Sequence, residues 1–174
     1  MKKHILLTGA TGTVGKEALK QLCEKSQYDI SVLGRDSSRN RKILEPYLDK
    51  ITLIGIDLSK PSQIGKLEGS YDVVIHLAAV IPPIADEEPE LTRKVNYLGT
   101  KHLIERLETI SPNVFFMFSS SIAVYGDRLK TPGISVKDQL PEHEEDAYAQ
   151  SKLDTEPIIR SSKLDWTIFR LTAI

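Results

Sequence analysis

Short runs of apolar and β-branched residues recur along the chain, each bounded by Gly, Pro, Ser or Asp. Continuous runs of this length are typical of strands buried on both faces, as in parallel sheets covered by helices. The pattern therefore predicts six strands, which begin near His4, Asp29, Ile51, Asp72, Asn113 and Asp165.

Segments with helical periodicity lie between these runs, at residues 14–25, 41–48, 91–110 and 144–161. Pro46 interrupts the second, and Pro157 is expected to cap, kink or divide the last. The alternation of strand and helix predicts an α/β fold: a Rossmann-type, doubly wound parallel sheet of about six strands with helices on both faces. A dinucleotide-binding sheet of this kind has the strand order 3-2-1-4-5-6.

Two segments rich in turn-forming and polar residues, 81–89 and 128–145, are predicted to be loops. In a doubly wound sheet we expect both to lie over the carboxyl ends of the strands, where ligands bind. They are the candidate substrate-facing loops.

Composition limits the class of protein. The chain has 174 residues, 40% of them hydrophobic, which predicts a single domain over residues 1–174. A net charge of −1 argues against binding to nucleic acid or to an anionic membrane. No apolar run approaches the roughly 18 residues of a membrane span, and the four histidines do not have metal-ligand spacing. The single cysteine, Cys23, favours a reducing, cytoplasmic location.

Three glycines, Gly9, Gly12 and Gly15, lie between the first predicted strand and the first predicted helix. In such a turn the first glycine permits a tight bend, the second lets the backbone approach a pyrophosphate, and the third lets the helix lie close to the sheet. The helix amides then face the anion. The position after the first strand favours a dinucleotide site over a glycine-rich turn without a ligand.

The residues at the end of the second predicted strand indicate whether the cofactor is NAD or NADP. An acid there binds the 2′-hydroxyl of the adenine ribose, and an arginine binds a 2′-phosphate. Gly34 occupies the expected place of the acid, and Arg35 follows at once. This favours NADP as cofactor. Asp36 keeps NAD possible, because a shift of one residue presents a carboxylate, and the basic residues at 39–42 are equally consistent with a solvated helix face.

Tyr148 and Lys152 are four residues apart on the last predicted helix, so they share one face. A nearby ammonium and an oxidised nicotinamide would lower the pKa of the tyrosine and let it exchange a proton. Alone, this pair is common on exposed helices. Three serines at 119–121, ending the fifth predicted strand, make a catalytic site the better interpretation.

These motifs, in this order, resemble the extended short-chain dehydrogenase/reductase family, in its nucleotide-sugar epimerase/dehydratase branch, over nearly the whole chain. The matching pieces are TGATGTVG, Asp57-Leu58, HLAA, VNYLGT, FSSSIAVYG, YAQSK and FRL. The resemblance implies that Tyr148 is the catalytic acid/base, that Lys152 binds the nicotinamide ribose and lowers the tyrosine pKa, and that Ser121 hydrogen-bonds the reacting oxygen. It implies cofactor contacts from Gly9, Thr11, Gly12, Thr13, Val14, Gly15, Arg35, Asp57, Leu58, Ala78, Ala79, Asn96 and Lys152.

Three further residues have open interpretations. Asn96 either supports the active site or is a satisfied polar residue on a buried helix face. His76 has no partner at catalytic spacing and is expected to be structural. Tyr125 either lines the substrate pocket or packs in the core.

The sequence departs from the family pattern in two places. Ile122 and Ala123 replace the Asp-Glu pair of the dehydratases, so epimerisation or carbonyl reduction is favoured over dehydration. Leu171 stands where the family has proline, and a C-terminal substrate lobe is expected to be absent. Three interpretations remain: a nucleotide-sugar oxidoreductase with little turnover as this chain, a reductase of small carbonyl compounds, or a non-catalytic NADP-binding module. The resemblance also implies a homodimer formed through segments 91–110 and 144–161.

Overall fold

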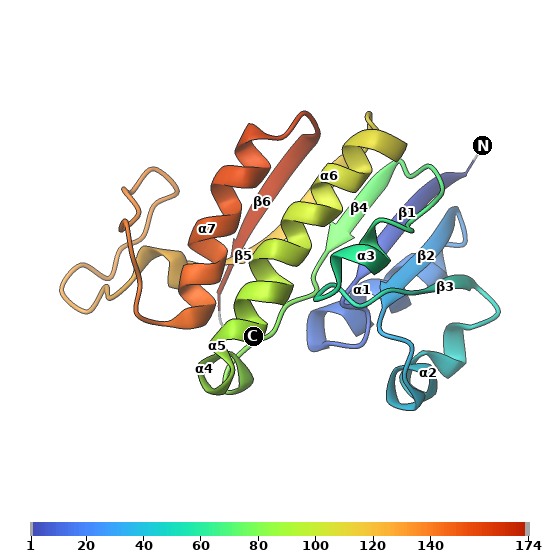
Figure 1. Cartoon of the computed structure of the whole chain (residues 1–174), viewed down its shortest axis with the longest axis horizontal. Helices are drawn as coiled ribbons and strands as arrows, with labels where there is room; N and C mark the ends of the chain where they lie inside the picture. The colour runs from blue at the N-terminus through green and yellow to red at the C-terminus, as the bar shows by residue number, and fades with distance from the viewer. Residues whose placement is uncertain (1, 173–174) are drawn as a thin grey trace.

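The computed structural model describes residues 2–172, which form one parallel six-stranded sheet (Figure 1). The strand order β3-β2-β1-β4-β5-β6 confirms the predicted Rossmann-type topology. Ala173 and Ile174, which belong to the predicted domain 1–174, lie outside the described residues. The strands are β1 (Lys3–Thr8), β2 (Tyr28–Gly34), β3 (Ile51–Gly55), β4 (Val73–His76), β5 (Phe115–Ser121) and β6 (Asp165–Leu171).

Two apolar clusters lie on opposite faces of the sheet. On one face, Leu19 of α1 (Thr13–Lys25) and Leu44 of α2 (Ser38–Leu44) pack with Leu7 and Val32. The larger cluster joins the sheet to α3 (Pro61–Ile64), α6 (Thr100–Ile110) and α7 (Ala147–Ser161), which Figure 1 shows on a common side. The side chains of Phe115 and Phe169 alternate away from this larger cluster and stay 39% and 45% exposed.

The long helix predicted at 91–110 is formed in three parts. It begins two residues earlier as α5 (Pro89–Thr92), because proline is favoured in a first helical turn. It continues as the π-helical segment η2 (Arg93–Gly99) and ends as α6. The π-helical segment contains the buried Asn96 and was not predicted, since apolar periodicity does not distinguish it from an α-helix.

The other helices also differ in part from the prediction. The last helix begins three residues later than predicted, where the Asp146 carboxylate accepts from the amide of Ala149, and Pro157 lies inside it without dividing it. The second starts earlier, at a cap formed by Ser37, and the 3-10 helix η1 (Glu45–Tyr47), which contains Pro46, follows it. Segment 81–89 contains the one-turn helix α4 (Ile84–Glu87), whereas 128–145 has neither helix nor strand.

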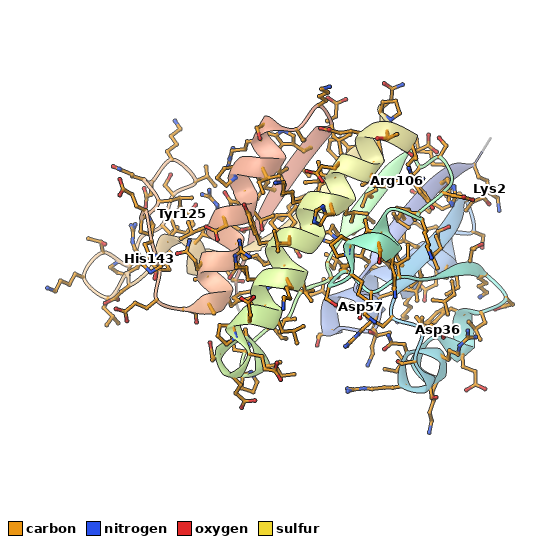
Figure 2. The ribbon with its side chains drawn as sticks, in the orientation of Figure 1. Lys2, Asp36, Asp57, Arg106, Tyr125 and His143 are labelled. Carbon is orange, nitrogen blue, oxygen red and sulfur yellow. The ribbon has the colours of Figure 1, made fainter. Side chains whose placement is uncertain are left out.

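The candidate functional residues lie at the carboxyl ends of the strands. Figure 2 shows Asp36 and Asp57 together at the β2–β3 end of the molecule, and Tyr125 and His143 at the opposite end. The one-turn 3-10 helix η3 (Ile122–Tyr125) continues directly from β5 on that second side. The fold thus separates a candidate adenosine region from a candidate catalytic region along one edge of the sheet.

Candidate functional site

The glycine turn is determined by close backbone approach at two of its three glycines. Gly9 has φ +73°, and a Cβ there would lie 2.6 Å from the backbone nitrogen of Ala78. A Cβ on Gly15 would lie 2.0 Å from the carbonyl oxygen of Gly9. Gly12, by contrast, is exposed, and a Cβ there would lie 3.4 Å from the carbonyl oxygen of Gly9. The fold itself therefore requires the first and third glycines, while the second leaves space for a ligand.

The N-terminus of α1 fits a dinucleotide pyrophosphate. Gly12 is its N-cap and supplies no side-chain hydrogen bond, so the first-turn amides of Thr13 and Val14 have no side-chain cap. These amides and the positive end of the helix dipole attract anions. Because Gly12 and Thr13 are exposed, phosphate oxygens can reach them.

A cleft of about 440 Å³ lies at the carboxyl ends of β2 and β3. Asp57 lines it, and its Oδ1 accepts from both the amide and the hydroxyl of Ser59. Leu58 does not line it, because that side chain is 7% exposed and belongs to the apolar core, and its cofactor contact stays a prediction. The lining residues are Arg35, Asp36, Ser37, Gly55, Asp57, Lys60 and Gln63.

The charged residues of this cleft differ in whether they already form a salt bridge. Asp36 accepts two hydrogen bonds from the guanidinium of Arg41, and this hydrogen bonding holds the pKa of the carboxyl below its usual value. Within residues 2–172, none of the salt bridges includes Arg35 or Lys60. The acid is therefore occupied by its neighbour, while two cations face the cleft.

Lys152 is buried at the other end of the sheet. Its side chain is 2% exposed, and its Nζ donates to the carbonyl oxygen of Ser119 at 2.7 Å. The same nitrogen lies 4.6 Å from the ring centre of Phe118 and 5.5 Å from that of Tyr148. Burial lowers the pKa of Lys152 to about 7, against the opposing charge of Glu156.

Tyr148 lies beside this lysine. Burial raises the pKa of Tyr148, and Asp146 adds to the rise, while the neighbouring Ser121 hydroxyl offsets part of it. The lowering expected from Lys152 together with an oxidised nicotinamide stays a prediction, and in the protein alone burial dominates the tyrosine pKa. The structure nevertheless brings Ser121, Tyr148 and Lys152 together, and their catalytic roles stay predictions.

Asn96 on η2 forms hydrogen bonds with Val80, in the segment after β4, and with Ser151 on α7. Its Oδ1 accepts from the amide of Val80 at 2.7 Å, and its Nδ2 donates to the carbonyl oxygen of Val80 at 2.9 Å and to Ser151 Oγ at 3.0 Å. The side chain is 2% exposed and both amide hydrogens have protein acceptors. This geometry favours the satisfied buried residue over a direct cofactor contact.

His76 lies in a buried hydrogen-bonded chain. Its Nδ1 lies 2.8 Å from Thr8 Oγ1, which also accepts from the amide of Ala78, and its Nε2 lies 2.8 Å from Thr100 Oγ1. Burial, followed by the charge of Lys152, lowers the pKa of His76 to about 3. The geometry supports the structural interpretation, in which a neutral imidazole links β1, β4 and α6.

Sequence reasoning missed several residues near these sites. Lys60 and Gln63 line the cleft, and the carbonyl oxygen of Ser119 holds Lys152. Glu156, which is 1% exposed, accepts from Ser120 and Arg170 beside the candidate catalytic residues. The spacing of four residues between Lys152 and Glu156 was the available signal, since such pairs meet on one helix face.

Sheet order, glycine turn and cleft together define a Rossmann-type dinucleotide-binding α/β protein. The chain belongs to the NAD dependent epimerase/dehydratase family, whose sequence model matches residues 5–174. This membership confirms the resemblance found in the motifs.

Individual relatives agree with the family. D-erythronate dehydrogenase of Haemophilus influenzae is 26% identical over 176 residues, covering 98% of this chain and 54% of that protein. UDP-glucose 4-epimerase of Vibrio cholerae is 30% identical over 191 residues, covering 100% of this chain and 52% of that protein. The chain thus spans about half the length of these relatives.

Solved structures show the same architecture. The UDP-Glc/GlcNAc 4-epimerase from Campylobacter jejuni is 28% identical, with a TM-score of 0.84, and the match covers 97% of this chain and 53% of that one. The enzyme WbmH of Bordetella bronchiseptica, solved in complex with NAD+, shares the fold at 19% identity, with a TM-score of 0.83 and coverage of 99% and 56%.

Two further observations concern residues 2–172 only. No helix among them is both long and apolar enough to span a membrane. No cluster of three or more His, Cys, Asp or Glu side chains in that range is arranged to hold a metal ion.

Proposed function

We propose that residues 1–174 form the NAD(P)-binding domain of an oxidoreductase or epimerase that acts at a carbinol or carbonyl carbon of a nucleotide-sugar-like substrate. The observation that carries the proposal is the buried Lys152, hydrogen-bonded to the end of β5 and adjacent to Tyr148. Relatives named as UDP-sugar 4-epimerases support the substrate class.

In this proposal the amides at the start of α1 bind the pyrophosphate, and the cleft lined by Arg35 and Asp57 takes the adenosine end. When bound, the nicotinamide supplies hydride exchange. Tyr148 gives or takes the hydroxyl proton at its phenolic oxygen, and Ser121 hydrogen-bonds the reacting oxygen. Lys152 holds the ribose and favours the phenolate through its charge.

The reaction is tested with Tyr148→Phe in the purified chain, using a panel of UDP-sugars and small carbonyl compounds. NMR of the products detects epimerisation, and absorbance of the reduced nicotinamide detects reduction. We expect turnover to fall by about 100-fold or more, because proton transfer is lost. Tyr28→Phe is the matched control, because Tyr28 begins β2 at the end opposite the carboxyl edge, and it should leave turnover unchanged. Full turnover in Tyr148→Phe would contradict the assignment.

The cofactor is proposed to be NADP in preference to NAD. Arg35 and Lys60 face the cleft as cations, Gly34 supplies no carboxylate, and the carboxylate of Asp36 is occupied by Arg41. Together these charges suit a 2′-phosphate better than a free 2′-hydroxyl.

Calorimetric titration with NADP and NAD tests this preference. Arg35→Ala should weaken NADP binding by about tenfold, since one charge-assisted hydrogen bond is lost, and leave NAD binding nearly unchanged. Arg39→Ala removes an exposed charge on α2 that does not line the cleft, and should leave both affinities unchanged. Tighter binding of NAD than of NADP would overturn the preference.

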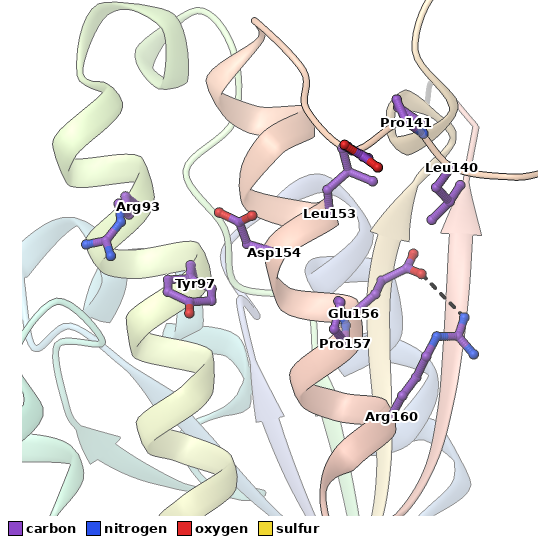
Figure 3. Close-up of a pocket in the computed structure, with 10 residues that line it drawn as sticks. Arg93, Tyr97, Leu140, Pro141, Leu153, Asp154, Glu156, Pro157 and Arg160 are labelled. Carbon is purple, nitrogen blue, oxygen red and sulfur yellow. Dashed lines mark hydrogen bonds and ion pairs between the residues drawn. The ribbon is translucent and has the colours of Figure 1, made fainter.

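The assembly is proposed to be a cytoplasmic homodimer, paired through the outer faces of the helices from Pro89 to Ile110 and of α7. A groove of about 490 Å³ lies on this side, between Tyr97 on η2 and Leu153 on α7 (Figure 3). Its mixture of apolar and charged lining residues suits a protein partner. Sedimentation velocity should give twice the 19.5 kDa chain mass, whereas a monomer at high concentration would contradict the dimer.

A further inference from the structure

A buried carboxylate, Glu156, lies one helical turn beyond Lys152 on α7. It accepts hydrogen bonds from Ser120 Oγ at 2.8 Å and from Arg170 Nε at 2.9 Å and Nη2 at 2.7 Å. Arg160 Nη2 approaches the same carboxylate at 3.4 Å. Burial alone would raise the pKa of Glu156, but the hydrogen bonds from Arg170 and Ser120 outweigh it and hold the pKa below its usual value.

The contacts of Glu156 extend to the segment that follows β5. Arg170 of β6 also donates from Nη1 to the Tyr125 hydroxyl at 2.6 Å, and its guanidinium lies 4.8 Å from the Tyr125 ring centre. Tyr125 ends η3, which begins directly after Ser121. One carboxylate therefore connects α7 with β5 and β6, and through Arg170 with η3.

This network meets the candidate catalytic site at three consecutive serines. The carbonyl of Ser119 accepts from Lys152, the side chain of Ser120 donates to Glu156, and Ser121 lies beside Tyr148. Lys152 and Glu156 therefore attach the same face of α7 to the same strand end, one turn apart. A slip or rotation of α7 against β5 would break both contacts together.

The charges around Lys152 give Glu156 a second role. The titratable groups facing the ammonium are His76 on β4, with Tyr148 and Glu156 on α7. Arg170 on β6 and Arg160 on α7 lie beyond Glu156 and bind its carboxylate. Burial holds His76 neutral, and Tyr148 also remains protonated near neutrality. Of these facing groups, Glu156 alone is negative at neutral pH, so its charge opposes the cost of burying the ammonium.

We propose that Glu156 is a positioning residue for the Ser121–Tyr148–Lys152 site: it fixes α7 against the end of β5 and supplies the counter-charge for the buried Lys152 ammonium. The inference rests on the proposed function, since it assigns Glu156 to that same site. In this role Glu156 acts through Lys152 and α7 and does not contact substrate or cofactor.

The test compares Glu156→Gln with wild type in protein carrying 13C at lysine Cε, where the NMR shift of Lys152 follows its protonation. The Lys152 signal is assigned by its disappearance in Lys152→Met. We expect the Lys152 titration midpoint to move to lower pH in Glu156→Gln. Asp154→Asn is the matched control, because it removes a negative charge from the same helix outside the network, and it should leave the midpoint in place. An unchanged midpoint in folded Glu156→Gln would overturn the proposal.

Glu156→Gln alone leaves the Arg170 guanidinium without its buried negative partner, which can prevent folding. The double variant Glu156→Gln/Arg170→Gln removes both charges of the pair and retains polar groups. It should fold, and its Lys152 midpoint should also lie below that of wild type. A wild-type midpoint in this variant would count against the proposal.

Turnover separates this inference from the proposed function. If Tyr148 and Lys152 act as proposed, the alkaline limb of the rate profile should move to lower pH in Glu156→Gln, together with the lysine midpoint. A moved lysine midpoint with turnover insensitive to Tyr148→Phe would refute the catalytic proposal and support the counter-charge role. Turnover that depends on Tyr148, with an unmoved lysine midpoint, would refute the role of Glu156.

Discussion

The two ends of the carboxyl edge are built in different ways. At the phosphate turn, the decisive contacts are between backbone atoms, and the glycines matter because they lack a Cβ. At the candidate catalytic end, buried polar side chains pair across long sequence distances: Asn96 and Ser151 are 55 positions apart, and Ser120 and Glu156 are 36 positions apart. A local backbone constraint leaves a short sequence motif, whereas a network between distant elements does not.

The largest effect is expected at the phosphate turn. Gly15→Ala places a Cβ 2.0 Å from a backbone oxygen, so α1 must move away from β1. We expect the free energy of unfolding to fall by about 3 kcal/mol, as measured by urea denaturation, because backbone cannot yield as a side chain does.

The matched variant Gly12→Ala meets its nearest neighbour at 3.4 Å. It should change the stability by less than about 1 kcal/mol and weaken dinucleotide binding, because the added methyl fills the ligand's approach. Equal stability losses at the two glycines would remove the distinction between a glycine required for packing and one required for the ligand.

A smaller loss is expected from Asn96→Ala at the catalytic end. The substitution leaves the amide and carbonyl of Val80 and the hydroxyl of Ser151 without this partner in a buried place. The expected cost is about 2 kcal/mol in the free energy of unfolding. Asn113→Ala, at an exposed position, should cost less than about 0.5 kcal/mol. If the two variants are equally stable, side-chain pairing does not hold this end together.

Over a single pH unit, the smallest effect is expected from two buried bases. The pKa of His76 is lowered by burial from 6.5 to about 3, and that of Lys152 from 10.5 to about 7. Between each pair of values the unfolded chain binds more protons than the folded one, so stability rises with pH from about 3 to 6.5 and again from about 7 to 10.5. Each group contributes at most about 1.4 kcal/mol per pH unit.

Urea denaturation of Lys152→Met at pH 7, 8 and 9 isolates the lysine contribution. The stability difference between wild type and the variant should shift in favour of wild type as the pH rises. Lys163→Met, at an exposed position, is the control and should show a constant difference from wild type. A constant difference for Lys152→Met as well would mean that the buried lysine keeps its ordinary proton affinity.

Much of the fold could be predicted because most strands and helices leave a pattern in their own stretch of sequence. The apolar runs predicted all six strands, and their order followed from the connection rules of parallel sheets. The start of α7 was displaced because the cap at Asp146, rather than the apolar pattern, sets it. The π-helical segment around Asn96 left no signal, since its stability depends on tertiary contacts with Val80 and Ser151.

The candidate site also has parts that the sequence predicts and parts that depend on packing. The glycine turn was recognisable in ten residues, and the Tyr148–Lys152 pair in five. The environment of Lys152 was not, because its burial and the carbonyl of Ser119 depend on how α7 packs on β5. The burial that raises the pKa of Tyr148 in the protein alone was not predicted for the same reason, because it also depends on how α7 packs.

Thr8 links the phosphate turn to the neighbouring strand through hydrogen bonds. Its hydroxyl accepts from Ala78 and pairs with His76, while the next residue, Gly9, touches both the backbone at Ala78 and the first turn of α1. Buried hydrogen bonds of this kind are not exchanged for bonds to water without cost. The end of β1 therefore cannot shift without straining β4 and, through His76 and Thr100, α6. Through these bonds the phosphate turn is joined to β4, which pairs with β5, the strand whose Ser119 carbonyl oxygen accepts from Lys152.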